Sequence, residues 1–424
     1  QYYDAVKFVA DTLGRDNINK SNLTFTGHSL GGILTAQLSV EFSVKGYAYN
    51  PFGANLLGYD DYKKYADIIK KWSDNNIYTI SYQDEGILNG DILSNLLTNL
   101  AGSHIGNFIP ILGKDKGFNA IGGHSIATLN DAIKEYNEIV KKFDNSCRYE
   151  DITNMYLSTA IIHGNGYEKV KEEFTKLGVY GANDNSLHLD VITPKSSVTS
   201  IFSGSNLSTP ALYALVNLNP FIVSGIKPRA YTILERYKDD FTKGYIEDKA
   251  KMFKAALTSS RTLDNKYYQD NISGIKIKPM FDNTGIVSSG DIKEQYYFGS
   301  NERDIITINS NGVSSNAENK IYTLAGDDTI IASKGNNYIE AGSGNDTIDL
   351  SRTSKNSKNI VYADIKGSKH SDNKNNNNDT IIGGAGTDTI YGGSGFDTYR
   401  VGNGDTIYDD KDGEGTVFFN NIEL

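Results

Sequence analysis

Ser29 lies in a short glycine-rich segment, Gly27-His28-Ser29-Leu30-Gly31, which fits the pattern G-x-S-x-G. A β-rich run over residues 23–26 precedes it, and a helical pattern over residues 30–44 follows it. Glycines on both sides of the serine leave space for a sharp turn from strand to helix, which would expose the serine hydroxyl near the helix N-terminus. The pattern predicts a nucleophilic serine, with the backbone N–H of Leu30 as one oxyanion donor.

A serine is a weak nucleophile, so a base and an orienting acid must act on it. In this strand–turn–helix setting the order along the chain is serine, acid, histidine. Asp84 comes just after the β-rich run 77–82, where such an acid belongs. Other acids compete with it, namely Glu85, Asp91 and the pair Asp60/Asp61. The pair more simply caps the helix that follows it, so we predict Asp84 as the acid.

Six histidines are candidates for the base. His28 adjoins the serine within the turn and points away from the site, and three others lie beyond residue 145: His163, His188 and His370. His124 lies in a loop directly before the helical pattern 127–143, whereas His104 lies in an apolar stretch rich in glycine. We predict His124 as the base, with His104 as its rival.

A second kind of chemistry is indicated by six nonapeptides, in two uninterrupted blocks at residues 323–349 and 374–400. Their pattern is G-G-x-G-x-D-x-U-x, where U is large and apolar and points inward from a short strand. The glycines permit a tight turn, and the Asp carboxylate and turn carbonyls supply the oxygen ligands that suit Ca²⁺. The predicted calcium-site residues are Asp328, Asp346, Asp379, Asp388, Asp397, Gly326, Gly344, Gly384, Gly386, Gly393 and Gly395.

Two nonapeptides make one full coil, so positions eighteen apart stack on the same side, as in the pairs Asp328/Asp346 and Asp379/Asp397. Asp388 and Asp405 are seventeen apart and nearly in register. Asn337 replaces the acid on the other side of the first block, which predicts a weaker half-site there. The polar insertion between the blocks, roughly residues 351–373, is expected to be a mobile surface loop. Stacked carboxylates would repel one another without calcium, so we expect this region to be unfolded at cytosolic calcium and folded outside the cell.

The elements that must position these residues fall into three regions. Residues 1–145 alternate strands and helices, which predicts a parallel sheet with helices on both faces. Residues 146–295 are mixed and mainly helical, with helices expected over 167–177, 210–218 and 245–257, and are interpreted as a connector or accessory domain. Residues 296–424 hold the repeats.

The repeats resemble those of the RTX family of secreted bacterial proteins, which form parallel β-rolls around calcium ions. The resemblance covers about 295–424. It implies structural calcium and secretion by a type I-like route, with an export signal that is not in this sequence.

Residues 24–32, Thr-Phe-Thr-Gly-His-Ser-Leu-Gly-Gly, resemble the signature of the lipase class 3 branch of the α/β-hydrolases, and residues 49–53 resemble the segment after its next strand. Asp84 and His124 match the family's acid and base in order and setting. Position 33 is Ile, where the family usually has a small residue. The strand with the second oxyanion donor is not found in the 28 residues before Ser29, so an N-terminally incomplete α/β hydrolase is expected over 1–145.

Together the two resemblances imply a secreted RTX lipase or phospholipase that cleaves lipid or phospholipid esters at a membrane or micelle surface. Residues 92–112 are rich in leucine, isoleucine and phenylalanine. They are interpreted either as a lid or lipid-facing surface or as an ordinary core helix, and both interpretations stay open.

Charge and composition exclude other classes. The net charge is −10, and residues 296–424 hold 19 acids and 11 bases, which argues against nucleic acid as a partner and for bound cations. The single cysteine, Cys147, excludes an intramolecular disulfide and a thiolate-rich metal site. The sequence contains no run of 18 apolar residues, so no membrane-spanning helix is predicted. The alternative function is a calcium-binding adhesion or matrix protein with an inactive hydrolase domain.

Overall fold

A computed structural model gives the fold of most of the chain. The described residues are 2–18, 23–28, 30–49, 76–84, 107–113, 126–203, 207–258, 261–262, 265–279, 292–308, 310–366, 377–409 and 415–424. The chain divides into two compact units. The first comprises Gln1–Val191 with Val223–Ile226, and the second comprises Ile192–Ile222 with Lys227–Leu424.

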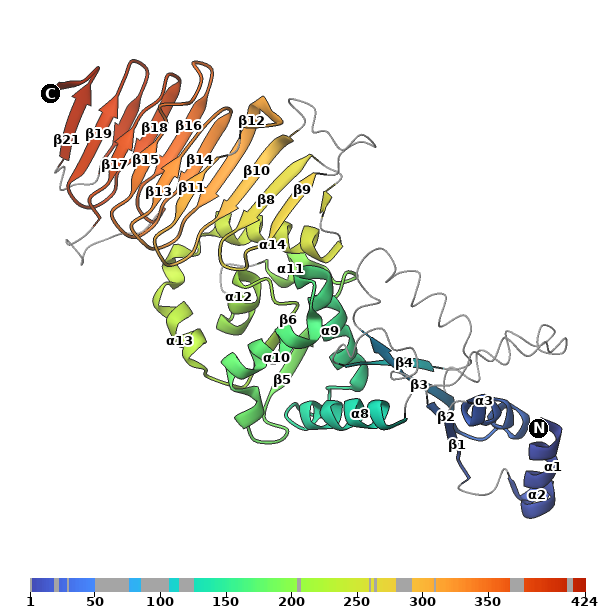
Figure 1. The fold of residues 1–424 in the computed structure, drawn as a ribbon. Helices are drawn as coiled ribbons and strands as arrows, with labels where there is room; N and C mark the ends of the chain where they lie inside the picture. The colour runs from blue at the N-terminus through green and yellow to red at the C-terminus, as the bar shows by residue number, and fades with distance from the viewer. Residues whose placement is uncertain are drawn as a thin grey trace. The chain divides into compact units, whose positions relative to one another are not determined.

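Four parallel strands form the described sheet of the first unit, in the order β1-β2-β3-β4 (Figure 1). They are β1 (Phe25–His28), β2 (Gly46–Tyr49), β3 (Ile77–Asp84) and β4 (Asn107–Gly113). Helix α3 (Leu30–Phe42) connects β1 to β2 and packs against both strands. The parallel pairing agrees with the prediction from the strand–helix alternation, whereas the helix expected after the pair Asp60/Asp61 lies outside the described residues.

A small core joins α3 to the preceding helices α1 (Tyr2–Leu13) and α2 (Arg15–Ile18). Its buried members are Val6, Val9, Ile18, Leu38, Phe42 and Val44. Strand β2 approaches α3 so closely that a Cβ on Gly46 would lie 2.2 Å from the Oγ of Ser39. Glycine at this position therefore allows the helix to lie against the sheet.

Two predictions for this unit need correction. The strand expected over 23–26 begins at Phe25, and its side chains are partly exposed because β1 is the edge of the described sheet. Residues 107–112, which we interpreted as part of a lid or a core helix, belong to the strand β4. A short apolar run fits a buried strand as well as a helix, and pairing with β3 decides between them. The rest of 92–112 lies outside the described residues.

The remainder of the first unit is mainly helical. It contains α8 (Ile126–Val140), α9 (Tyr149–His163), α10 (Gly166–Leu177), a 3₁₀ turn (Val179–Gly181) and β5 (His188–Val191). Aromatic side chains such as Tyr136, Tyr156 and Phe174 are buried among these helices. The helices expected over 127–143 and 167–177 are confirmed as α8 and α10.

Helices open the second unit. They are α11 (Val198–Ile201), α12 (Thr209–Val216), α13 (Arg229–Arg236), a 3₁₀ turn (Lys238–Asp240) and α14 (Lys243–Thr258). The strand β6 (Phe221–Ser224) follows α12, and its residues Val223 and Ser224 belong to the first unit, where β6 pairs with β5. The helices expected over 210–218 and 245–257 are confirmed as α12 and α14.

The rest of the second unit is a β-roll of two facing sheets (Figure 1). The nine-stranded sheet has the order β20-β18-β16-β14-β12-β10-β8-β9-β7, and the seven-stranded sheet has the order β11-β13-β15-β17-β19-β21-β22. Successive strands alternate between the sheets from β10 to β21, and neighbours within a sheet are parallel over this range. The predicted parallel β-roll is confirmed. It begins before residue 296, because β8 and β10 belong to it.

The strands of the nine-stranded sheet are β7 (Arg261–Thr262), β8 (Lys266–Asp270), β9 (Lys276–Pro279), β10 (Ile292–Phe298), β12 (Val313–Tyr322), β14 (Asn336–Glu340), β16 (Lys358–Tyr362), β18 (Thr387–Tyr391) and β20 (Thr406–Tyr408). Those of the seven-stranded sheet are β11 (Ile305–Thr307), β13 (Thr329–Ile331), β15 (Thr347–Asp349), β17 (Thr380–Ile382), β19 (Asp397–Val401), β21 (Gly415–Phe419) and β22 (Ile422–Glu423). The predicted inward residues Ile330, Ile339, Ile348, Ile381, Ile390 and Tyr399 all belong to the core between the sheets.

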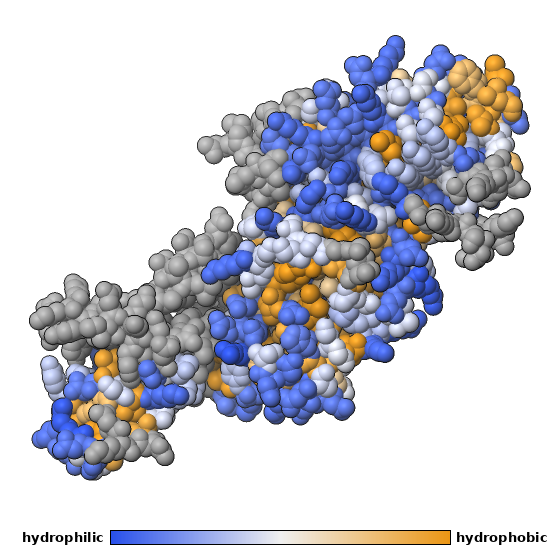
Figure 2. Space-filling model, turned by 180° about the vertical axis from the view of Figure 1, so that it is seen from behind, coloured by the Kyte–Doolittle hydropathy of each residue, from blue (hydrophilic) through white to orange (hydrophobic). Residues whose placement is uncertain are grey.

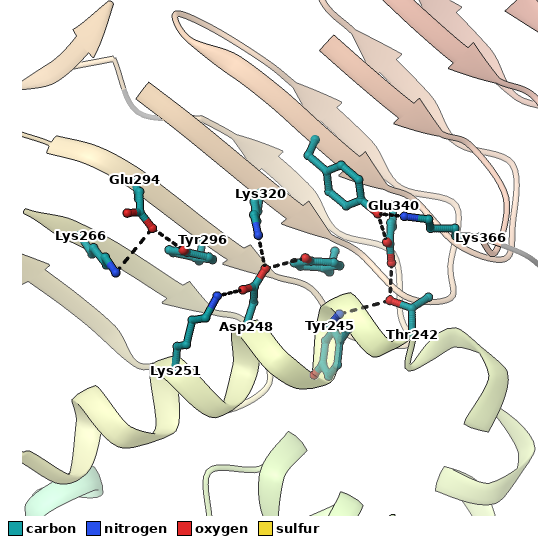
Figure 3. Close-up of polar contacts among 12 residues, drawn as sticks. Thr242, Tyr245, Asp248, Lys251, Lys266, Glu294, Tyr296, Lys320, Glu340 and Lys366 are labelled. Atoms are coloured by element: carbon teal, nitrogen blue, oxygen red, sulfur yellow. Dashed lines mark hydrogen bonds and ion pairs between the residues drawn. The ribbon is translucent and has the colours of Figure 1, made fainter. Parts of the chain in front are cut away.

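Helix α14 is attached to the nine-stranded sheet by polar side chains (Figure 3). Asp248 accepts from Lys320 Nζ at 2.9 Å and from the Tyr322 hydroxyl at 2.7 Å, both on β12. Thr242, just before α14, donates to Glu340 of β14 at 2.5 Å. These contacts, together with the Tyr245 ring against Tyr322, tie the helix to the first coils of the roll.

The roll ends at its C-terminal side with hydrophobic residues in solvent. Figure 2 shows an orange area at this end, where Ile422 and Leu424 are 68% and 82% exposed. Elsewhere the apolar positions of the repeats face inward, so the core of the roll is enclosed along its length.

Candidate calcium site and catalytic residues

One edge of the roll carries an aspartate in five successive coils, at the entrance to the seven-stranded sheet. This carboxylate row consists of Asp304, Asp328, Asp346, Asp379 and Asp397. The Oδ1 of each aspartate accepts from the backbone N–H of the preceding one in the row, at distances of 2.7 to 2.9 Å. The predicted stacking of Asp328 on Asp346 and of Asp379 on Asp397 is confirmed.

The second carboxylate oxygen, Oδ2, of three aspartates in this row makes the row suitable for binding a cation. The Oδ2 atoms of Asp328, Asp346 and Asp379 are buried and have no hydrogen-bond partner. A buried polar atom without a partner is costly, and a hard cation satisfies such an oxygen. Among the described residues, no three acidic, histidine or cysteine side chains gather into a metal-binding group, so main-chain carbonyls would have to complete the coordination.

The turn glycines bring such carbonyls close. In the turns next to the carboxylate row, Gly326, Gly344 and Gly395 have φ of +134°, +138° and +121°. A Cβ on these residues would lie 2.7, 2.1 and 2.2 Å from backbone oxygens of the preceding coil. The other predicted glycines are equally confined by neighbouring oxygens: Gly384 by Thr353 and Leu350, Gly386 by Ser357, and Gly393 by Asp364. The turns therefore stack as the calcium-binding pattern requires.

Burial of the carboxylate row disfavours its negative charge when no metal is bound. Desolvation, with a smaller contribution from neighbouring carboxylates, raises the pKa of Asp328 to about 7, of Asp346 to about 8 and of Asp379 to about 9. Burial also raises the pKa of Asp397 to about 6. Protons or a divalent cation must compensate this charge, and calcium does so at neutral pH.

The opposite edge of the roll has a different composition. At the corresponding position it carries Gln295, Asn319, Asn337 and Asn359, which we call the amide row, and then Asp388 and Asp405. The Oδ1 of Asp405 accepts from the backbone N–H of Asp388 at 3.0 Å, so the predicted near-register of this pair is confirmed. The Oδ2 of Asp388 accepts from the backbone N–H of Gly384 at 2.7 Å.

Three members of the amide row were not predicted from the sequence. Gln295 and Asn319 precede the recognised repeats, and Asn359 lies in the insertion that we expected to be a mobile loop. That expectation is wrong for residues 358–362, because they form β16 and Val361 is fully buried in the core. The available signal was the two-residue spacing from Asn359 to Val361, which repeats the spacing from Asp to U.

The predicted catalytic residues are only partly described. Ser29 and His124 lie outside the described residues. Leu30 begins α3, and Asp84 is the last residue of β3, with the side chains of both outside the description. The strand β1 ends at His28, so a single residue separates it from α3.

Comparison with known proteins identifies the repeats. The family model for the RTX calcium-binding nonapeptide repeat (4 copies) matches residues 315–351 and 375–408. No curated protein and no solved structure matches the chain. The matched stretches contain all five predicted calcium-ligating aspartates, so this part of the protein consists of calcium-binding repeats in which calcium has a structural role.

Repeats of this family are typical of secreted proteins. Within the part of the chain that the structure describes, no helix has the length and apolar character needed to cross a membrane.

Gly342 provides a test of the stacked turns. Its φ is +103°, and a Cβ would lie 1.7 Å from the backbone oxygen of Leu324 one coil earlier. We expect Gly342→Ala to lower the unfolding free energy in calcium by about 3 kcal/mol or more, measured by urea denaturation. Gly274→Ala is the matched control, because Gly274 also has positive φ, +73°, but has open space around its Cβ. An equal, small loss of about 1 kcal/mol for both would contradict the close stacking.

Proposed function

We propose that the protein is a carboxylic ester hydrolase that acts on lipid acyl esters, as a lipase or phospholipase with calcium-folded repeats. One observation carries the proposal: the three catalytic positions follow the carboxyl ends of parallel strands. Ser29 comes directly after β1, Asp84 ends β3, and His124 comes after β4. Such ends meet at one edge of a parallel sheet, which is where the sites of α/β enzymes form.

The turn around Ser29 gives further support. A Cβ on Gly27 would lie 2.2 Å from the backbone oxygen of Gly31 and 2.7 Å from the Oγ1 of Thr35. The end of β1 and the first turn of α3 therefore approach each other as closely as a tight strand–serine–helix turn demands. Backbone N–H groups in the first turn of a helix have no intrahelical acceptor, so we assign the N–H of Leu30 to the oxyanion.

In the proposed reaction, the Oγ of Ser29 forms a bond to the ester carbonyl carbon while His124 takes its proton. Asp84 orients the imidazole and stabilises its positive charge. The bond between the carbonyl carbon and the alcohol oxygen then breaks, and the alcohol leaves with the proton from His124. A water molecule, deprotonated by His124, attacks the acyl-enzyme and releases the fatty acid, which restores Ser29.

Labelling with a fluorophosphonate probe tests the proposal, because such probes react with activated serines. We expect labelling at Ser29, and a loss of at least about 10³-fold in kcat/KM on p-nitrophenyl esters in Ser29→Ala. Ser186→Ala is the control, because Ser186 is an exposed serine of the same unit outside the β1–β4 sheet. A wild-type protein without labelling and without esterase activity would contradict the proposal and favour the calcium-binding adhesion or matrix protein.

A further inference from the structure

The amide row is a continuous hydrogen-bonded chain of side chains along one edge of the roll. Gln295 donates to Asn319 at 2.8 Å, and Asn319 donates to Asn337 at 2.9 Å. Asn337 in turn donates to Asn359, and Asn359 donates to Asp388, both at 2.7 Å. Each of the four amides is at most 1% exposed. A buried polar chain of this kind stabilises a structure when every member has a partner.

The residues at the two ends of the amide row fix the direction of its hydrogen bonds. The Tyr297 hydroxyl donates to the Oε1 of Gln295 at 3.0 Å, so the Gln295 nitrogen faces the next coil. At the other end the carboxylate of Asp388 only accepts, so Asn359 must donate to it. The orientation of the intervening amides follows, because each nitrogen needs the oxygen of its neighbour.

Amide nitrogens in this row bind the turn carbonyls that calcium would bind. The Nδ2 of Asn319 also donates to the backbone oxygen of Lys334 at 2.9 Å. The Nδ2 of Asn337 lies 3.4 Å from the backbone oxygens of Ser333 and Gly335. In the carboxylate row, by contrast, the corresponding Oδ2 atoms of Asp328, Asp346 and Asp379 have no hydrogen-bond partner.

We propose that the amide row holds its edge of the roll without metal from Gln295 to Asn359, and that this edge requires calcium only from Asp388 onward. The carboxylate row takes calcium at Asp328, Asp346 and Asp379, whose Oδ2 atoms have no hydrogen-bond partner. At the two ends of the row, the Oδ2 of Asp304 accepts from Ser300 and that of Asp397 accepts from Tyr399. The coils therefore differ in their dependence on the ion: the first have one metal-free edge, and the last have carboxylates on both edges.

The contacts of α14 strengthen the same end of the roll. Asp248 binds Lys320 and Tyr322, and Thr242 binds Glu340, without any metal (Figure 3). The roll then has a calcium-independent base, formed by α14 with β10, β12, β14 and β16, on which the calcium-dependent coils are built. This inference rests on the second unit alone and is independent of the proposed hydrolase activity.

Hydrogen–deuterium exchange of the whole protein, with calcium and with EDTA, tests the inference. In EDTA we expect amides of β10, β12, β14 and β16 to exchange at least about 10-fold more slowly than those of β17, β18, β19 and β20. With calcium, both groups are expected to be protected. Equal exchange of the two groups in EDTA, whether fast or slow, would overturn the proposal.

Asn337→Asp tests the role of the amide itself. The carboxylate cannot donate to Asn359, so exchange at β12, β14 and β16 in EDTA is expected to rise about 10-fold, and calcium should restore protection. Asn316→Asp is the matched control, because it makes the same charge change at an exposed position of β12 and should leave exchange unchanged. Wild-type exchange in Asn337→Asp, or an equal rise in both variants, would overturn the proposal. If Asn337→Asp does not fold even with calcium, the wild-type pattern decides.

Discussion

Without calcium, the repeat region is expected to become more stable as the pH falls from about 9 to about 5. Burial raises the pKa of four aspartates of the carboxylate row from an ordinary 3.8 to values of about 6 to about 9, in Asp328, Asp346, Asp379 and Asp397. Between these values and the pKa of the unfolded chain, the folded roll binds more protons than the unfolded chain does. Stability is therefore fully present at acid pH and is lost as the pH rises through the folded-state values.

Urea denaturation in EDTA at a series of pH values measures this dependence. We expect the unfolding free energy of the repeat region to fall by at least about 3 kcal/mol as the pH rises from about 5 to about 9, because one unit of pKa shift corresponds to about 1.4 kcal/mol. In saturating calcium the dependence should reverse, since protons compete with the cation for the same oxygens. A free energy that rises with pH in EDTA would contradict the pKa directions.

A single substitution separates the row from the rest of the acidic surface. Asp346→Asn keeps the Oδ1 that accepts from the backbone N–H of Asp328 but removes one buried titrating group. We expect a weaker pH dependence in EDTA and weaker calcium binding. Asp327→Asn is its matched control, because this exposed carboxylate accepts from Asn345 through an oxygen that asparagine retains. Identical effects of the two substitutions would show that overall acidity, rather than the buried row, controls folding.

Which residues of each repeat face the core of the roll could be predicted, because this depends on a local sequence pattern. An aspartate or asparagine two residues before a buried apolar residue recurs every nine residues within each block, and the core contains every apolar residue that this rule selected. The rule failed where the nine-residue count was interrupted. Asn359 and Val361 lie in the polar insertion between the two blocks, and Gln295 and Tyr297 lie in a coil whose turns lack the glycine pattern. Only the pairing of strands places these residues in register with the repeats.

Long-range contacts account for the other differences. The run 107–113 has no periodicity that separates strand from helix, and its pairing with β3 is a contact between distant residues. The amphipathic pattern of α14 predicted a helix, but nothing in the pattern indicated that Asp248 would meet Lys320 across 72 positions. In the hydrolase region the order of Ser29, Asp84 and His124 relative to the strands follows from the sequence. The distances between these side chains remain a prediction, because two of the three residues lie outside the described ones.

The second large effect is expected from the ion pair between Lys249 of α14 and Asp270 of β8. Both side chains are 0% exposed, and the Lys249 Nζ lies 2.5 Å from the Oδ1 of Asp270 and 4.9 Å from the centre of the Phe298 ring. The other oxygen of Asp270 accepts from the backbone N–H of Ser273 at 3.0 Å. Burial lowers the pKa of Lys249, so its charge depends on the partner carboxylate.

Asp270→Asn is expected to destabilise the second unit by about 3–5 kcal/mol, because it leaves a buried ammonium without a counter-charge. Asparagine retains an oxygen for Ser273, so the loss reports on the charge rather than on the turn. Calorimetric unfolding in calcium measures it. The double variant Lys249→Met/Asp270→Asn should regain more than half of the loss, since removing both charges removes the desolvation cost.

The control for this pair is Lys251→Met, on the same helix. Lys251 is 44% exposed and pairs with Asp248, which keeps Lys320 and Tyr322 as partners. Lys251 is partly in solvent and the buried Asp248 keeps two other partners, so removing the Lys251 charge should cost about 1 kcal/mol or less, and this variant should unfold close to the wild type. If Asp270→Asn loses no more stability than Lys251→Met, or if the double variant is no more stable than Asp270→Asn, the buried pair is not what joins α14 to β8. In that case the aromatic contacts of Tyr245 with Phe298 and Tyr322 would have to carry the attachment.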